Sequence, residues 1–231
     1  MIFKREMKRN LKSLVIWAAI LCGLILMLLG MYPQFAEEEQ MMNDMIEAYP
    51  DSLKEAFGMD VLNFGSVLGF YGVEVHLFTT LIGSVYAAML GAGILVKEEQ
   101  EKTIEFLLSK PVTRTQVVLH KLGAVLANVA VLNAAFIVTS LIGFQFAKED
   151  EVSLGTFAWL SLAALLLHLT MASVAFLLSA IMRKSRSIIS ISLGIVFLSY
   201  ALHIVAGVSE TFEGMGHVSF FHYVDAADIV A

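Results

Sequence analysis

Five long stretches of the chain contain no Asp, Glu, Lys or Arg. A helix of about 20 apolar residues, rising about 1.5 Å per residue, crosses a hydrocarbon core about 30 Å thick, so each stretch is long enough to span a membrane. The 231-residue chain is 58% hydrophobic and 16% charged, whereas soluble domains are about 45–50% apolar and about 25% charged. The sequence therefore predicts an all-α fold, a polytopic helical membrane bundle. The five stretches are Leu14–Tyr32, Val75–Val96, Leu122–Ala147, Val152–Met182 and Ser187–Ser209.

We expect a single transmembrane domain over residues 1–231, with five visible spans and an amphipathic inner segment between the second and third. An interfacial helix is predicted over residues 1–13, because basic and apolar residues alternate there at helical spacing. The spans are predicted at about residues 14–32, 75–96, 122–147, 155–182 and 187–209, with the inner segment at 97–121.

The basic residues are distributed very unevenly along the chain. If all five stretches span the membrane, one face carries thirteen of the 15 Lys and Arg, in segments 4–12, 97–121 and 183–186. Cytoplasmic loops carry the excess of Lys and Arg in membrane proteins. We therefore expect a multi-pass protein of the cell (plasma) membrane, bacterial in origin, with its N-terminus in the cytoplasm. Most of the 21 acidic residues fall on the opposite face.

The sequence lacks the common motifs of catalytic and metal-binding sites. It has no Gly-x-x-x-x-Gly-Lys-Ser/Thr loop, no His-Glu-x-x-His pair, no Cys/His cluster with zinc spacing and no Gly-x-Ser-x-Gly elbow. Its single cysteine, Cys22, excludes an intrachain disulfide. We predict no catalytic residue, no metal site, no cofactor bound by this chain and no nucleic-acid partner.

A few polar side chains fall inside the predicted spans. Such residues are costly in hydrocarbon and are candidates for function, although Asn and His also join helices by hydrogen bonds. His168 lies near the middle of the fourth stretch, and Asn128 and Asn133 lie in the third. These three are the candidates for a substrate path, with interhelical packing as the alternative. Separately, small residues recur every four positions at Gly83, Ala87 and Gly91, so another helix is expected to approach closely there.

The inner segment 97–121 has the most informative pattern. Its first part is amphipathic, with apolar residues such as Ile104 and Leu108 on one helical face and charged residues on the other. Pro111 must end that helix, and Thr113 with Gln116 three residues later forms a capping box for a new helix. The segment is therefore predicted to be either a plain interfacial helix or a docking element for a soluble partner.

The inner segment carries a motif of Glu99, Thr103, Glu105, Leu107, Leu108, Ser109, Pro111, Val112 and Arg114, followed by Lys121. This motif resembles the permease subunits of ABC type-2 exporters. The resemblance covers most of the chain, although only the inner segment is specific, and Lys102 stands where the family usually has Gly. It implies a permease that pairs with a separate ABC ATP-binding subunit, which would carry ATP and Mg, and with a second permease copy in the lipid bilayer. By this resemblance, segment 97–121 is the coupling segment that meets the ATPase. The residues implied in that contact are Glu98, Glu99, Thr103, Glu105, Leu108, Pro111 and Arg114.

The family has six spans, and only five stretches precede Ala231. Residues 217–231 resemble the short outer re-entry that comes before the sixth span, so we expect either a truncated chain or a partner helix that completes the bundle. The predicted function is that of an exporter permease that forms the substrate path and performs no bond chemistry. The alternative is a membrane scaffold or assembly protein without a transport path, because polar residues within the spans are sparse.

Overall fold

The computed structural model describes residues 2–37, 46–57, 59, 62, 66–96, 112–146, 152–182, 185–208 and 210–230, and the statements below concern these residues. They form helices and no strand. Five helical segments are long and apolar enough to cross a membrane. Four are α1 (Ile2–Glu37), α8 (Arg114–Gly143), α9 (Leu154–Ile181) and α10 (Ser185–Val208), and the fifth runs continuously through α4 (Val67–Phe70), η1 (Tyr71–His76) and α5 (Leu77–Ile94). The prediction of an all-α membrane bundle is confirmed.

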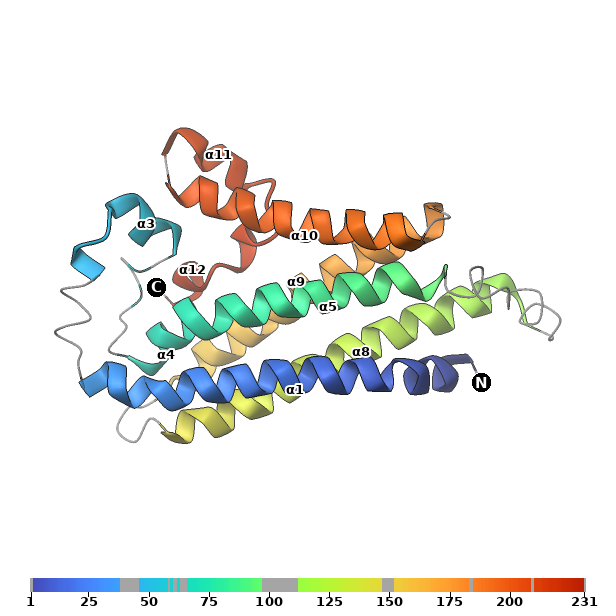
Figure 1. Cartoon of the computed structure of the whole chain (residues 1–231), viewed down its shortest axis with the longest axis horizontal. Helices are drawn as coiled ribbons and strands as arrows, with labels where there is room; N and C mark the ends of the chain where they lie inside the picture. Colours follow the sequence, from blue (N-terminus) through green and yellow to red (C-terminus); the bar gives the residue numbers. More distant parts are fainter. Residues whose placement is uncertain are drawn as a thin grey trace.

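The long helices run roughly along one axis, with α5 in the middle of the bundle (Figure 1). α5 packs most extensively against α9 and also against α10, while α1 packs mainly along α8. The N-terminus lies at one end of the bundle, and the C-terminus lies toward the other end beside α4 (Figure 1). Of the five spans, that of α5 is the most buried, and those of α1 and α10 are the least buried.

The close approach predicted from the small residues of the second span occurs between α5 and α9. A Cβ added at Gly91 would overlap the backbone carbonyl oxygen of Ala172, and one added at Gly83 would overlap the His168 ring. Ala87 is fully buried between them. Small residues therefore allow α5 and α9 to touch backbone to backbone, which increases van der Waals contact where lipid provides no hydrophobic driving force.

Two helices extend beyond their predicted bounds. Residues 2–13, predicted as an interfacial helix, are the first turns of α1 and are continuous with the first span. The second span begins at Val67 rather than near Val75, because the Ser66 side chain accepts a hydrogen bond from Gly69 N and starts a helix there. Glu74 thus falls in a π-helical turn, η1. The absence of charge indicates which part of a helix lies in the membrane. Where the helix itself begins or ends is decided by capping.

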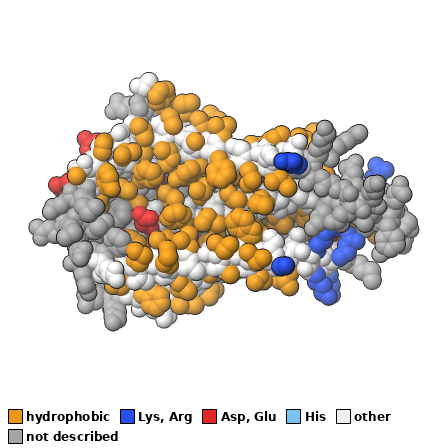
Figure 2. Space-filling model, viewed as in Figure 1, with side chains coloured by type: hydrophobic (Ala, Val, Ile, Leu, Met, Phe, Trp, Pro, Cys, Tyr) orange, Lys and Arg blue, Asp and Glu red, His pale blue; other side chains and the backbone are white. Residues whose placement is uncertain are grey.

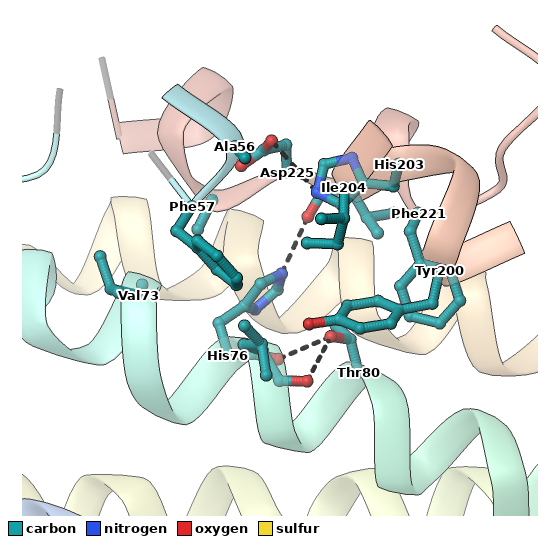
Figure 3. Close-up of a pocket in the computed structure, with 14 residues that line it drawn as sticks. Ala56, Phe57, Val73, His76, Thr80, Tyr200, His203, Ile204, Phe221 and Asp225 are labelled. Carbon is teal, nitrogen blue, oxygen red and sulfur yellow. Dashed lines mark hydrogen bonds and ion pairs between the residues drawn. The ribbon is translucent and has the colours of Figure 1, made fainter. Parts of the chain in front are cut away.

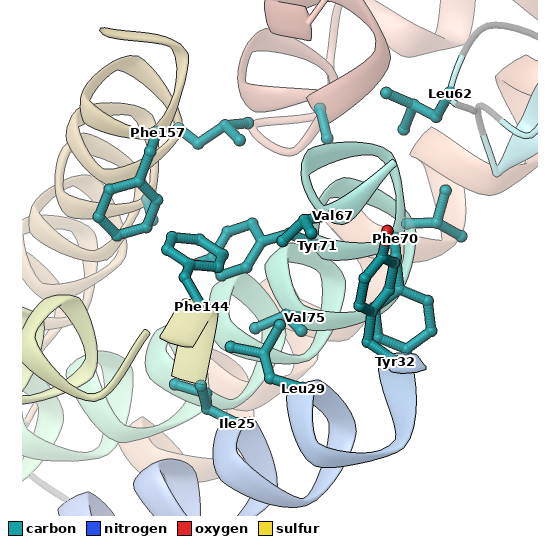
Figure 4. Close-up of a cluster of buried hydrophobic side chains, with 14 of the residues drawn as sticks. Ile25, Leu29, Tyr32, Leu62, Val67, Phe70, Tyr71, Val75, Phe144 and Phe157 are labelled. Carbon is teal, nitrogen blue, oxygen red and sulfur yellow. The ribbon is translucent and has the colours of Figure 1, made fainter. Parts of the chain in front are cut away.

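Aromatic rings close the bundle at the end opposite the N-terminus (Figure 4). Tyr71 of η1 packs against Phe144 and Phe157, with ring centroids 5.3 and 5.5 Å away. Its hydroxyl lies 3.2 Å from the Ser140 hydroxyl. Leu29 and other α1 residues extend the same cluster. One aromatic core therefore joins α1, η1, η2 (Phe144–Phe146) and α9.

Short helices cover this end of the bundle. α3 (Asp51–Ala56) follows Pro50 and lies on α10, where a Cβ added at Gly207 would come within 2.6 Å of the Ala56 Cα. Lys54 bonds to the exposed Asp51 carboxylate at 2.7 Å, and this hydrogen bond and positive charge lower the pKa of Asp51. After α10 come η3 (Glu210–Phe212), α11 (Glu213–Gly216), η4 (His222–Val224) and α12 (Ala226–Val230).

The residues after α11 turn back into the bundle, as the predicted outer re-entry would. Phe221 is buried with its ring centroid 5.4 Å from that of Tyr200 on α10. Ala226 and Ala227 are buried against the aromatic cluster. Ser219 donates a hydrogen bond to the Ser199 carbonyl oxygen at 2.6 Å, which attaches the tail to α10.

Charge separates the two ends of the bundle as the sequence predicts. Hydrophobic side chains cover the middle of the surface in Figure 2, with Lys and Arg at one end and Asp and Glu at the other. We call these the basic end and the acidic end. The basic end holds the start of α1 and the start of α8, and an apolar belt between charged ends suits a bundle that crosses a bilayer.

The contact at Gly91 gives a direct test of the α5–α9 packing. Gly91→Ala should destabilise the protein by about 1–3 kcal/mol, because the new methyl group forces the two helices apart. Gly93→Ala on the same helix is the matched control, since a Cβ there meets nothing within 4 Å, and it should be neutral or slightly stabilising. Both are measured as free energies of unfolding in detergent, and equal losses would contradict this packing.

Candidate functional site at the basic end

The structure describes both flanks of the predicted coupling segment but only one of its predicted contact residues. Arg114 is the first residue of α8 and is exposed. The remaining predicted contacts lie outside the described residues: Glu98, Glu99, Thr103, Glu105, Leu108 and Pro111. Their roles stay predictions.

The restart after Pro111 has the capping box that the sequence predicts. Thr113 Oγ1 accepts a hydrogen bond from Gln116 N at 3.2 Å, and Gln116 Oε1 accepts one from Thr113 N at 3.0 Å. Two backbone N–H groups that have no partner within the helix are thus satisfied at the first turn of α8. The segment therefore ends at a well-defined helix start.

The other flank of the predicted coupling segment is the end of α5, which contacts a buried lysine of α8. Lys121, about two turns after the start of α8, is 1% exposed, and its ammonium group donates a hydrogen bond to the Ile94 carbonyl oxygen. Ile94 is the last residue of α5, where carbonyl groups have no partner within the helix and the helix dipole favours a cation. The end of α5 and the beginning of α8 are thereby linked directly at the two ends of the predicted coupling segment.

A buried carboxylate brings α1 into the same contact. Glu6 is 2% exposed, and its Oε1 lies 4.0 Å from Lys121 Nζ, 3.8 Å from an Arg9 guanidinium nitrogen and 3.4 Å from one of Arg5. A buried carboxylate is tolerated only with such partners, since isolated charges are very costly away from water. We call Glu6, Lys121 and the Ile94 carbonyl group the basic-end clamp.

The clamp is a feature that sequence reasoning did not identify. In the sequence, Lys121 is distinguished only by following the inner motif. One signal was present for Glu6, which is the sole acidic residue among the five basic residues of segment 4–12. Nothing in the linear pattern pairs it with a lysine on the third span.

The three candidates for a substrate path make internal hydrogen bonds. His168 is fully buried, with Nε2 donating to the Thr79 carbonyl oxygen of α5 at 3.2 Å and Nδ1 3.2 Å from the Asn133 Oδ1 of α8. Asn133 Nδ2 donates to the Val129 carbonyl oxygen at 2.8 Å. The structure thus brings two of the candidates together and gives them an interhelical packing role.

Asn128 lies apart from this pair. Its Nδ2 donates to the Ala124 carbonyl oxygen at 2.7 Å and lies 3.0 Å from the Met7 sulfur. It therefore connects α8 to the first turns of α1, near the basic-end clamp. A path role for these three residues stays a prediction.

At the acidic end, a cavity of about 50 Å³ separates the returning tail from α5 and α10 (Figure 3). His76 Nε2 donates to the Val224 carbonyl oxygen at 2.9 Å, and His203 Nε2 lies 3.5 Å from an Asp225 carboxylate oxygen. These contacts fasten the tail to two spans. Among the residues described, no group of three or more His, Cys, Asp or Glu could hold a metal ion.

Comparison with protein families assigns this architecture. The model of a family described as ABC-2 family transporter protein matches residues 1–230. The chain belongs to this family. No curated protein and no solved structure matched the chain.

Family membership makes the chain a membrane permease of an ABC transporter. Such a permease is the transmembrane component and not the ATPase, and membership implies association with an ABC ATP-binding subunit. The resemblance inferred from the inner motif is thus confirmed. In this ABC-2 permease, the clamp links the two helix ends between which the predicted coupling segment runs.

The clamp predicts an unequal response to its two mutations. Lys121→Met should destabilise the permease by about 3–5 kcal/mol, because Glu6 then lacks its α8 partner and the end of α5 loses its cap. The double variant Glu6→Gln/Lys121→Met should lose less than the sum of the two single variants. Unfolding free energies in detergent measure both.

The matched control is Lys12→Met, which removes the same charge from an exposed position on α1. It should change the free energy of unfolding by less than about 0.5 kcal/mol. Strict additivity of the Glu6 and Lys121 losses would show that the two groups do not interact.

Proposed function

We propose that this chain is the permease subunit of an ATP-driven exporter and that it receives the ATPase at its basic end. Segment 97–121 docks the ATP-binding subunit, which carries ATP and Mg, and a second permease copy completes the substrate path. The basic end faces the cytoplasm of a bacterial cell, and the bundle lies in the plasma membrane. The single observation that carries this proposal is the clamp, which ties α1, α5 and α8 where the segment leaves and re-enters the bundle.

The mechanism follows from this attachment. A force applied by the ATPase to the segment reaches α5 through Ile94 and α8 through Thr113, and Lys121 makes the two helix ends move together. Glu6 extends the link to α1, so three of the five spans respond as one unit. ATP binding changes the bundle only if it stabilises one packing of the spans over another. The buried α5–α9 contact transmits that change to the acidic end.

A scaffold or assembly protein is the second candidate, and a specific observation favours it. His168 donates to the Thr79 carbonyl oxygen and Asn133 donates to the Val129 carbonyl oxygen, so both side chains have partners within the protein without a transported solute. Single cysteines placed around them distinguish the two functions. Accessibility that changes when the ATPase binds nucleotide supports a transport path, and protection that never changes supports a scaffold.

ATPase docking is tested by co-purification of the tagged permease, from its native host, with an ABC ATP-binding subunit. Glu105→Ala and Arg114→Ala should each reduce the retained ATPase activity by roughly tenfold, as expected when charged hydrogen bonds are lost from an interface. Thermal stability should not change, since Arg114 is exposed. Asp51→Ala is the control, being an exposed charge at the acidic end. Retention equal to wild type in both variants would contradict the docking surface.

Orientation has its own test, which uses the single native cysteine. In a Cys22→Ser background, Asp51→Cys should react with a membrane-impermeant maleimide on intact cells, whereas Lys8→Cys should react only after lysis. This is the result expected if the basic residues remain in the cytoplasm. The reverse labelling pattern would place the coupling segment on the wrong side for an ATPase.

A further inference from the structure

The first turns of α1 present an exposed row of lysines. Lys4, Lys8 and Lys12 are spaced four residues apart, and all three are exposed. Because residues four apart lie one above the other on a helix, the three side chains share one face, over about 12 Å along the axis. We call Lys4, Lys8 and Lys12 the lysine row. It belongs to the end of the bundle where Lys and Arg gather in Figure 2.

The lysine row has no counter-charge within the protein. Glu6 is the only acidic residue in segment 4–12, and it is 2% exposed and faces Lys121 in the clamp. Among the residues that the structure describes, none of the three lysines forms an ion pair with a carboxylate. The row therefore offers its positive charges to a partner outside the chain.

The position of the row along α1 places it at the membrane surface. α1 has 36 residues and is about 54 Å long, whereas the hydrocarbon core of a bilayer is about 30 Å thick. The charge-free stretch Leu14–Tyr32 spans that core, so segment 4–12 lies at the level of the headgroups. Lysine side chains at this level lay their methylene groups along apolar surface and keep the ammonium group among the headgroups.

The face that carries the row also carries exposed apolar side chains. Leu11 is 54% exposed and Val15 is 56% exposed. They lie about 60° and about 20° from Lys8 around the helix axis, at about 100° per residue. Basic residues at the headgroup level and apolar residues beneath them match the order of groups in an anionic phospholipid. A soluble anion would match the lysines alone.

We propose that the lysine row docks the headgroups of anionic phospholipids, whose acyl chains lie along Leu11 and Val15. The phosphate oxygens accept charge-assisted hydrogen bonds from the ammonium groups. Docking holds α1 at the depth where Glu6, on the opposite face, meets Lys121. The lipid belongs to the cytoplasmic leaflet if the basic end faces the cytoplasm as proposed, whereas the preference for anionic lipid depends neither on orientation nor on the ATPase.

A tryptophan placed beside the row reports which lipid lies there. Trp17→Phe and Trp159→Phe remove both native tryptophans, and Val15→Trp adds one reporter at an exposed position. The full chain is reconstituted in vesicles that mix phosphatidylglycerol and phosphatidylcholine, with bromine on the acyl chains of one lipid or the other, because bromine quenches tryptophan on contact. At low salt, phosphatidylglycerol should be favoured roughly fivefold, about the effect of one lysine at an anionic headgroup. In about 1 M salt, where the Debye length is about 3 Å, the preference should approach equality.

Neutral variants identify the charges that act. The triple variant Lys4→Gln/Lys8→Gln/Lys12→Gln should reduce the preference to less than about twofold, and its stability in detergent should stay unchanged because the side chains are exposed. Lys8→Gln alone should reduce the preference by roughly half. Arg186→Gln is the matched control, since it removes one exposed charge from the same end of the bundle, on α10 (Figure 1), and it should keep the wild-type preference.

Several outcomes would overturn the proposal. Equal quenching by the two brominated lipids would show that α1 does not recognise an anionic headgroup. Equal losses in Lys8→Gln and Arg186→Gln would show a general attraction of acidic lipid to the basic end. Loss of the preference on addition of inorganic phosphate at constant ionic strength would show a site for soluble anions.

A comparison with ATPase retention separates lipid docking from the proposed function. If the triple variant keeps the lipid preference but retains less ATPase, the row contacts the ATPase and the lipid proposal is wrong. If the lipid preference depends on the row while no ATPase co-purifies, lipid docking is supported and only the proposed coupling to an ATPase is contradicted.

Discussion

Hydrocarbon offers no hydrogen-bond partner, so a charged or strongly polar group at membrane depth is stabilised chiefly by partners within the protein. Three ionisable side chains meet this constraint in the same way, by bonding to a backbone carbonyl group of another element. Lys121 bonds to Ile94, His168 to Thr79 and His76 to Val224. The first two bonds end on the second span, and the third starts from it. The hydrogen bonding of the bundle is therefore organised around the second span.

The packing of the helices is also centred on the second span. Small residues at Gly83 and Gly91 bring α9 against α5, and α10 covers another side of α5. α1 and α10 remain the least buried spans. A helix that is buried within its own subunit transmits displacement, while one with an open face contacts lipid or a second subunit. The basic-end clamp contacts the buried helix at its last residue, Ile94, next to the predicted coupling segment.

The two cavities differ in a way that follows from their positions. The smaller one, at the acidic end, lies beneath the returning tail, where His76 is already satisfied by Val224. The larger one, of about 230 Å³, lies between α1 and α5. There the Tyr86 hydroxyl group and the Asn10 Nδ2 have no hydrogen-bond partner among the described residues.

Much of the fold could be predicted from local pattern. Charge-free runs identified five spans, Thr113 and Gln116 identified the start of α8, and Gly83, Ala87 and Gly91 identified a face that another helix approaches. The identity of that helix was not predictable, because small side chains permit close approach without selecting a partner. The candidate site was predicted as a segment, 97–121, from Pro111 and the amphipathic pattern. The clamp beside it was missed because Glu6 and Lys121 are far apart in the chain.

Local physics is thus what the sequence by itself determined: hydrocarbon excludes charge, a capping box starts a helix, and Lys and Arg gather at one end of the bundle. These are properties of single segments and need no knowledge of neighbours. The tertiary structure alone decided which carboxylate meets Lys121, which residues satisfy His168 and where a cavity remains between α1 and α5. Those outcomes depend on how helices rotate and pack against one another, and only the complete set of contacts determines that.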